Sequence, residues 1–231
     1  NDTYRTILER KTAKPRIYKA TATGELDGKD GVLLSAKTLA EKRRDMGIYT
    51  FGTQMMLNPK SDETQGFKRE WLRHYRNVNA GHKMNKYILV DPAHSKKKGS
   101  DYTAMWVIGL GPDENYYALD IIRDRLSLPQ RAQRLMDLHA KWKPLEVRYE
   151  RYGLQADIEH IQTVQEATNY RFPIIEVAGD VAKPERIKRL IPLFENGRIW
   201  LPVSHHYTNA DGEVRDLVHD FIEDEYAAFP V

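Results

Sequence analysis

The stretch Tyr87-Ile88-Leu89-Val90-Asp91-Pro92 decides the fold, because an apolar run of strand-forming residues ends in a carboxylate followed by proline. Such a run predicts a central strand, and Asp91-Pro92 places an acid at its exposed tip. A second acid, Glu150, closes the alternating apolar run 145–150. Two acids at the ends of two strands indicate a site for divalent metal ions.

The segments around these acids predict one continuous domain. Strands are expected at 86–91, 103–110 and 115–123, with a turn at 111–114, and these three should pair antiparallel. A helix at 129–142, with Ser127 as its cap, leads to the strand that ends at Glu150. Helices are then expected at 154–164, 184–195 and 213–228, and strands at 173–177 and 199–201.

This order predicts an α/β domain with the ribonuclease-H-like fold, a mixed central sheet of three antiparallel strands followed by parallel strands, with helices on both faces. The crossover through one helix would bring the Glu150 strand beside the Asp91 strand and parallel to it. Asp91 and Glu150 would then be neighbours. A generic α/β domain of another topology is the alternative.

Residues 1–80 differ in composition from the rest of the chain, with many Lys, Arg, Thr and Gly and only short apolar clusters. Ser35 can cap a helix that runs to about Met46, where Gly47 is a plausible stop. A short linker at 77–82 predicts a boundary, so we expect an N-terminal appendage at 1–80 and the main domain at 81–231.

Composition narrows the class of protein. The chain has 231 residues, 41% hydrophobic and 30% charged, which is ordinary for a globular protein, and its net charge of +3 is compatible with a polyanionic partner without proving one. The chain contains no cysteine, which excludes disulfides, thiolate zinc sites and cysteine nucleophiles. No apolar stretch approaches the roughly 20 residues of a membrane span, and the N-terminus has no signal-peptide core, so we expect a soluble, intracellular protein without a membrane partner.

In several segments the chain resembles the nuclease domain of the large terminase subunit of tailed double-stranded DNA bacteriophages. Residues 91–93 with 99–104 resemble that family's first acidic motif, and Tyr149-Glu150-Arg151-Tyr152-Gly153 stands where the family has its second acid. Residues 183–187 and 192–199 resemble a downstream segment of the domain. Residues 51–59 and 67–72 resemble the segment that joins the packaging ATPase to the nuclease.

The resemblance implies an endonuclease that cuts double-stranded DNA concatemers during genome packaging by two-metal hydrolysis, with Mg²⁺ or Mn²⁺ held by Asp91 and Glu150. It also implies that residues 1–80 are a remnant of the linker region between ATPase and nuclease. The implied partners are double-stranded DNA and the rest of the packaging motor, that is the ATPase domain, the small terminase and the portal. The implied place of action is the procapsid in the host cell cytoplasm.

Two features depart from the family pattern. No Gly-x-x-x-x-Gly-Lys-Ser/Thr motif occurs in the sequence, so we expect no ATPase in this chain. The segment that precedes the family's third acidic motif resembles 221–230, so we expect the usual third metal ligand after Val231.

Other residues have a functional and a bland interpretation. Asp91 could be a simple Asp-Pro turn, and Glu150 could belong to a solvated strand face with Glu146 and Arg148. Asp101 could cap a turn or act as an outer metal ligand, and Glu225, inside the apolar arc of the expected last helix, could substitute as a ligand or bend to solvent. DNA phosphates could be bound by two basic groups, which are otherwise only solvated charges: Lys96, Lys97 and Lys98, and Arg186, Lys188 and Arg189.

Two rival functions remain open at this point. One is another ribonuclease-H-like nuclease or a transposase-type enzyme, in which a DNA 3′-hydroxyl replaces water as the nucleophile. The other is a catalytically incomplete module that docks and guides DNA in the packaging motor, because the expected third acid is missing from the sequence.

Overall fold

The computed structural model describes residues 6–7, 9–10, 14, 16, 18–22, 34–57, 66–77, 83–93, 102–150, 155–177 and 181–230. The chain divides into two compact units, Asn1–Gln65 and Gly66–Val231. This boundary lies before the predicted one at residue 80, because β1 (Arg73–Tyr75) pairs with a strand of the second unit and so belongs to its sheet. Among the described helices, none is long and apolar enough to cross a membrane.

The first unit contains one long helical element, α2 (Ala36–Gln54). Its N-terminus is capped as predicted, since the Ser35 hydroxyl accepts a hydrogen bond of 3.2 Å from the Thr38 amide. Gly47 interrupts the helix with a φ of 76°, a backbone conformation that glycine adopts without steric cost. The predicted stop is therefore a kink, after which the helix continues and Phe51 packs with Leu39 and Met56 in a small buried cluster.

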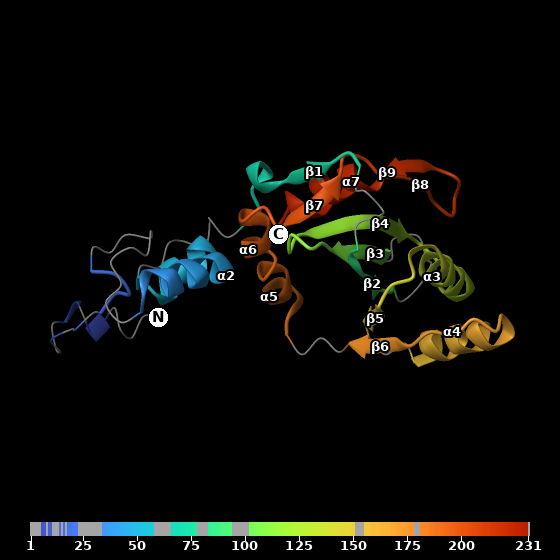
Figure 1. Cartoon of the computed structure of the whole chain (residues 1–231), viewed down its shortest axis with the longest axis horizontal. Helices are drawn as coiled ribbons and strands as arrows, with labels where there is room; N and C mark the ends of the chain where they lie inside the picture. The colour runs from blue at the N-terminus through green and yellow to red at the C-terminus, as the bar shows by residue number, and fades with distance from the viewer. Residues whose placement is uncertain are drawn as a thin grey trace. The chain divides into compact units, whose positions relative to one another are not determined.

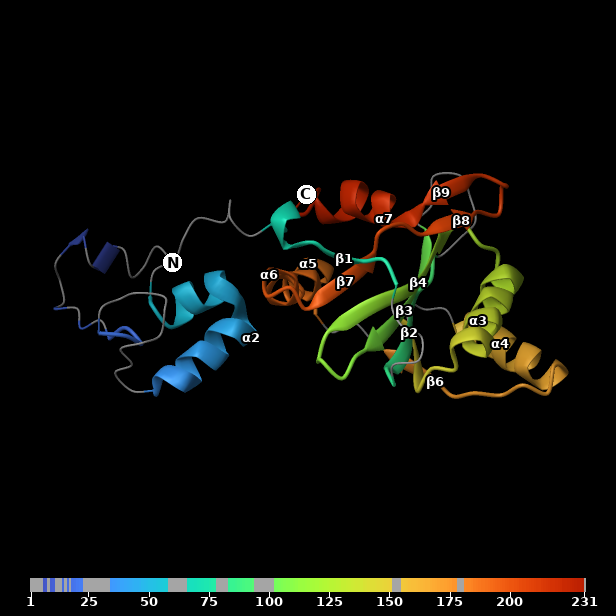
Figure 2. The same cartoon turned by 45° about the horizontal axis from the view of Figure 1, so that its top comes forward.

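The second unit is built on a seven-stranded mixed sheet in the order β1-β7-β4-β3-β2-β5-β6 (Figures 1 and 2). Strands β2, β3 and β4 pair antiparallel, and the pairs β2–β5, β5–β6, β4–β7 and β1–β7 are parallel. The remaining strands are β2 (Asn85–Asp91), β3 (Thr103–Leu110), β4 (Tyr116–Asp124), β5 (Glu146–Glu150), β6 (Ile174–Val177) and β7 (Ile199–Pro202). The predicted ribonuclease-H-like fold is confirmed.

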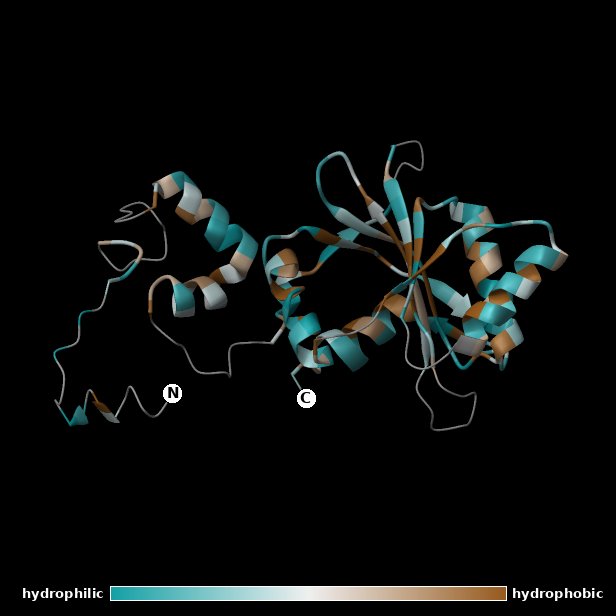
Figure 3. Ribbon diagram, turned by 90° about the horizontal axis from the view of Figure 1, so that it is seen from below, coloured by the Kyte–Doolittle hydropathy of each residue, from teal (hydrophilic) through white to brown (hydrophobic). Residues whose placement is uncertain are grey.

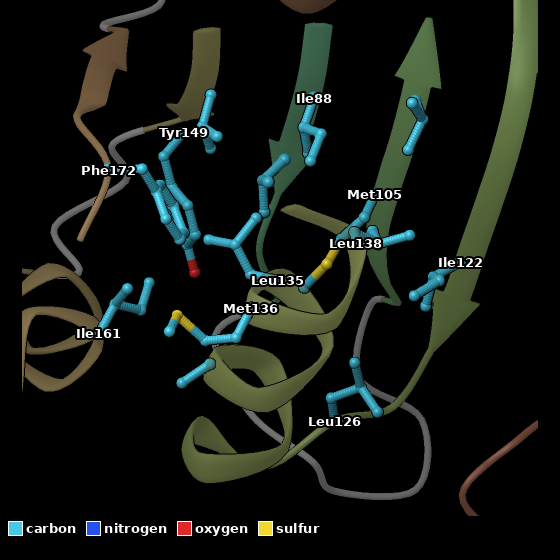
Figure 4. Close-up of a cluster of buried hydrophobic side chains, with 14 of the residues drawn as sticks. Ile88, Met105, Ile122, Leu126, Leu135, Met136, Leu138, Tyr149, Ile161 and Phe172 are labelled. Atoms are coloured by element: carbon cyan, nitrogen blue, oxygen red, sulfur yellow. The ribbon is translucent and has the colours of Figure 1, made fainter. Parts of the chain in front are cut away.

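Helices α3 (Leu128–Trp142) and α4 (Gln155–Ala167) cover one face of this sheet. Figure 4 shows the main core there, where strand residues such as Ile88, Met105 and Tyr149 meet Leu135 of α3 and Ile161 of α4. The start of α3 is fixed by Ser127, whose amide donates to the Gln130 side chain at 2.9 Å. Side chains alternate along a strand, so the residues between these core positions face the other side of the sheet.

That other face carries a smaller core and a second set of helices (Figure 3). Ala118 and Ile121 of β4 and Leu201 of β7 pack there against Leu217 and Val218 of α7 (Leu217–Asp220). The π-helical segment η3 (Phe221–Tyr226) continues α7, and the short 3₁₀ segment η2 (Arg69–Trp71) precedes β1. The sheet therefore has helices on both faces, as predicted.

Two expected helices differ from the structure. The helix expected at 213–228 begins only at Leu217, because residues 206–208 and 214–216 form a hairpin of β8 (His206–Thr208) and β9 (Val214–Asp216). Asp216 then caps α7, since its carboxylate accepts from the Val218 amide at 3.1 Å. The helix expected at 184–195 is split into α5 (Lys183–Lys188) and α6 (Ile191–Glu195), because Pro192 has no N–H with which to continue the hydrogen-bond ladder.

A buried ionic network joins α3 and α4 to β5. The guanidinium of Arg131 donates two hydrogen bonds of 2.8 Å to the Asp157 carboxylate, which also accepts one of 2.5 Å from the Tyr149 hydroxyl. Arg131 and Asp157 are only 5% and 2% exposed. Burial, with the neighbouring Asp157 carboxylate, raises the pKa of Tyr149 above its usual range, so the hydroxyl stays a donor. The network holds β5 one residue before Glu150.

A second buried carboxylate, Asp120 of β4, ties the sheet to the end of α3. It accepts hydrogen bonds of 2.7 Å from Lys141 and 2.8 Å from Trp142, and its other oxygen lies 3.2 Å from His205 Nε2. Burial alone would raise the pKa of Asp120, but the hydrogen bonds from His205, Lys141 and Trp142 outweigh it and lower that pKa well below its usual value.

Replacing Asp157 by Asn should lower the free energy of unfolding by about 3–5 kcal/mol, because it leaves the buried charge of Arg131 uncompensated. All four tryptophans lie in the second unit, so urea unfolding followed by tryptophan fluorescence reports on it. The control is Glu166→Gln on the same helix, whose ion pair with Arg171 is 4.0 Å long and exposed, and which should change stability by less than about 1 kcal/mol. Equal effects of the two substitutions would contradict the structural role of the network.

Asp120→Asn should lower the unfolding free energy at pH 7 by about 1–3 kcal/mol, because the charge-assisted hydrogen bonds are weakened. A carboxyl whose pKa is lowered in the folded state stabilises the protein above its unfolded-state pKa, near 3.9, and this contribution disappears as the pH falls further. The gap between wild type and variant should therefore narrow below about pH 4 in urea titrations. Asp137→Asn, at an exposed site on α3, should show a small and pH-independent change; a pH-independent gap for Asp120→Asn as well would contradict the assignment.

Candidate active site

The two acids predicted from the sequence lie side by side at the carboxyl ends of two neighbouring interior strands, β2 and β5. Strands β2 and β5 are parallel, with Val90 opposite Tyr149, so Asp91 and Glu150 are the next residue along each strand. Val90 and Tyr149 point into the main core, so alternation places both acids on the opposite face. Neighbouring strands lie about 4.8 Å apart, a spacing over which two carboxylates can share a cation. The side chain of Asp91 is 46% exposed and that of Glu150 only 13%.

Helix α5 brings two basic side chains to these acids. Arg186 Nη1 lies 2.7 Å from Glu150 Oε1, and Lys183 Nζ lies 3.9 Å from Asp91 Oδ2. Arg186 is partly buried, whereas Lys183 at the first turn of α5 is 70% exposed. The acids therefore carry counter-charges from a single short helix.

The donor set fits a hard divalent cation. Asp91 and Glu150 offer only carboxylate oxygens, the ligands that Mg²⁺ and Mn²⁺ prefer. Glu150 Oε1 is buried and accepts no aligned hydrogen bond from the described residues, although Arg186 is close enough to pair with it by charge. No group of three or more His, Cys, Asp and Glu side chains suited to a metal occurs in the part of the chain that the structure describes.

Glu225 lies with a different partner. Its carboxylate is 2.9 Å from Arg123 Nε, and the neighbouring Asp224 is 3.8 Å from Arg123 Nη1. Arg123 of β4 stands opposite Ala104 of β3, which stands opposite Asp91, so the three residues form one row across the sheet on the same face. Glu225 thus contacts the row two strands away from Asp91, and the structure does not group it with the two acids.

The residues predicted to bind DNA have different positions. Arg186 points to Glu150, Lys188 pairs with Glu185 at 3.0 Å, and Arg189 is exposed at the end of α5. Asp101, Lys96, Lys97 and Lys98 lie outside the described residues, so their roles stay predictions.

Sequence reasoning missed three residues near the site. Lys183 was passed over although it shares its helix with Arg186. Arg123 and Arg125 both lie over the ring of Tyr102, with their guanidinium carbons 4.2 and 4.1 Å from its centre. Arg123 lies in the row of Asp91 only because the pairing of β3 with β4 shifts by one residue between Val107 and Ile108. Without that shift, counting across the hairpin from the pair Leu110 and Tyr116 would place Ile122 opposite Ala104, so the sequence pattern does not give this position.

Comparison with known proteins places this geometry in a family. The family described as the terminase RNaseH-like domain matches residues 88–227. No curated protein sequence matches the chain significantly. Among solved structures, the chain is similar to the large terminase nuclease from thermophilic phage G20c with bound magnesium, at 17% identity and a TM-score of 0.41, covering 64% of this chain and 83% of that one. It is also similar to the yeast mitochondrial Holliday junction resolvase Ydc2, at 10% identity and a TM-score of 0.36, covering 82% of this chain and 83% of that one.

The family match includes both strand-end acids and the basic helix α5, and it spans more than half of the chain. This chain therefore belongs to the terminase RNaseH-like domain family.

Proposed function

We propose that this chain is the endonuclease domain of a terminase large subunit, which cuts double-stranded DNA concatemers during genome packaging. Membership of the terminase RNaseH-like domain family supports a nuclease function. The single observation that carries the proposal is the pair Asp91 and Glu150, which share one face at the carboxyl ends of two parallel strands.

The chemistry follows from the two carboxylates. Divalent cations bound there, Mg²⁺ or Mn²⁺ and two in number, would supply an ionised water as nucleophile and neutralise the charge on the leaving oxygen. Glu150 is nearly buried and fixed by the strand, so it would orient its ion, while the more exposed Asp91 would face both ion and DNA. Arg186 and Lys183 add positive charge beside the reacting phosphate.

The proposed partners follow from the same function. Double-stranded DNA would be held through its phosphates, by Lys188 and Arg189 of α5 and by the loop lysines 96–98, with little preference for sequence. The ATPase domain, the small terminase and the portal of a packaging motor would complete the machine at the procapsid in the host cytoplasm. Residues 1–80, as a remnant of the linker region between ATPase and nuclease, would connect to that motor, and ATP hydrolysis would be supplied by the ATPase domain.

One alternative has an observation in its favour. Since the described residues contain no three-acid cluster, the chain could serve as a DNA-docking module of the motor that does not cut by itself. A strand-transfer enzyme on the same fold has no specific observation in its favour. Metal-dependent degradation of a plasmid separates a nuclease from a docking module.

Asp91→Asn and Glu150→Gln should each lower metal-dependent plasmid cleavage by orders of magnitude, because a neutral amide keeps the shape of the side chain but removes the charge that holds the cation. Glu146→Gln is the matched control: Glu146 lies on the same face of β5 and pairs with Arg148 at 2.9 Å rather than with the site. The control should cleave like the wild type. Cleavage by either site variant at the rate of the control would remove that acid from the site.

DNA binding should weaken steeply with salt and differ little between duplexes of unrelated sequence, because each phosphate that the protein neutralises releases counterions. Changing Lys96, Lys97 and Lys98 together to Ala should reduce the slope of log affinity against log salt by about 0.9 for each phosphate that is no longer neutralised. Fluorescence anisotropy over a salt series measures the slope. An unchanged slope in the triple variant would leave these lysines as ordinary solvated charges.

A further inference from the structure

The contact between Arg186 and Glu150 has an unusual combination of properties. The two groups are 2.7 Å apart, and the acid is only 13% exposed, yet the oxygen concerned accepts no aligned hydrogen bond from the described chain. A bidentate, aligned pair such as Arg131 with Asp157 shows what a permanent structural ion pair looks like in this protein. The pair at the site is held by charge and proximity instead.

The positive charge of Arg186 reduces the electrostatic cost of placing two carboxylates side by side. Two carboxylates on adjacent strand ends repel each other, and a nearly buried ionised Glu is costly to keep without a counter-charge. Arg186 compensates Glu150, and the more distant Lys183 partly compensates Asp91. Both basic groups come from α5, a helix of six residues.

A divalent cation bound at Glu150 Oε1 would supply the same compensating positive charge. A metal ion and a guanidinium both carry positive charge, so they cannot occupy Glu150 Oε1 together without strong repulsion. The side chain of Arg186 is 32% exposed and that of Lys183 is 70% exposed, so each has solvent into which it can turn. When DNA is bound, Arg186 and Lys183 can leave the acids and pair with its phosphates.

We propose that Arg186, assisted by Lys183, is an exchangeable counter-charge of the site: it neutralises the acids until cations bind, and then contacts DNA phosphate. This inference rests on the proposed function, because it assumes that Asp91 and Glu150 hold metal. Metal binding and DNA binding are then coupled. A bound cation displaces Arg186 from Glu150 and frees it for DNA phosphate, and bound DNA holds Arg186 away from Glu150 and so favours the cation. Arg186 is a positioning residue that sets the order of assembly at the site.

The first test measures Mn²⁺ binding without DNA, from the electron paramagnetic resonance signal of free Mn²⁺ during titration. Arg186→Gln should bind Mn²⁺ about two- to fivefold more tightly than the wild type, the range expected from removing a partly exposed competing ion pair. Arg186→Lys should stay near the wild type because it keeps the charge. Lys183→Gln, at an exposed position where folding is not at risk, should shift affinity in the same direction by a smaller factor.

The matched control is Arg148→Gln, which removes a guanidinium from the same face of β5 that pairs with Glu146 and not with the site. Its Mn²⁺ affinity should equal that of the wild type. Equal affinities for Arg186→Gln and Arg148→Gln would overturn the exchange, and weaker binding by Arg186→Gln would show that Arg186 supports the metal-bound form instead. Absence of Mn²⁺ binding in the wild type and in every variant would overturn the proposed metal site itself, a different result from either.

The second test measures DNA binding with and without cation, using a short duplex, Ca²⁺ in one series and a chelator in the other. Arg186→Gln should bind the duplex as the wild type does in chelator, where Arg186 is held by Glu150. Only in Ca²⁺ should its affinity fall, together with a decrease of about 0.9 in the salt slope. A decrease of equal size in both series would show that Arg186 contacts DNA permanently, and no decrease in either would show that it never does; both results contradict the exchange.

Discussion

The parallel pairing of β2 with β5 is the contact on which the rest of this site depends. Its register sets Val90 opposite Tyr149 and thereby brings Asp91 beside Glu150. Side chains alternate along a strand, so a slip of one residue in either strand would turn one acid into the core and leave the other alone. The fold places the carboxyl ends of β2 and β5 next to each other, and the register puts both acids on the same face.

The opposite face of the same strands secures this register. Ile88, Val90, Val147 and Tyr149 are buried under α3 and α4, and the Tyr149 hydroxyl is tied to Arg131 through Asp157. The ion pair of Arg131 with Asp157, on the side of α3 and α4, is bidentate and nearly inaccessible to water. The pair of Arg186 with Glu150, on the opposite face of the sheet, is partly exposed. Guanidinium and carboxylate thus form one buried, bidentate pair and one partly exposed pair without an aligned hydrogen bond, and the proposed exchange concerns only the second.

Much of the sheet could be predicted because its strands carry strong local signals. Residues 103–110 are a mostly apolar run that ends at the turn residues 111–114, and the apolar run before Asp91 ends at Asp91-Pro92, so both patterns predict strands. The last helix was predicted too early, because an apolar arc from Val214 onward looks helical, while Asp216 caps the helix and the preceding residues pair as a hairpin. Strand β1 was missed, because three residues paired only with β7 carry no pattern of their own.

The sequence by itself determined the two acids, their places at strand ends, and the family resemblance that the match over residues 88–227 confirms. These are local properties, since an apolar run followed by Asp-Pro can be recognised without knowing its neighbours. Only the tertiary structure decided which basic side chains lie beside the two acids and which other carboxylates pair with different residues. Lys183 and Arg186 reach the site from a helix more than thirty residues after Glu150, and Glu225 is taken up by Arg123. Such pairings depend on how helices cross the sheet, a non-local outcome of core packing.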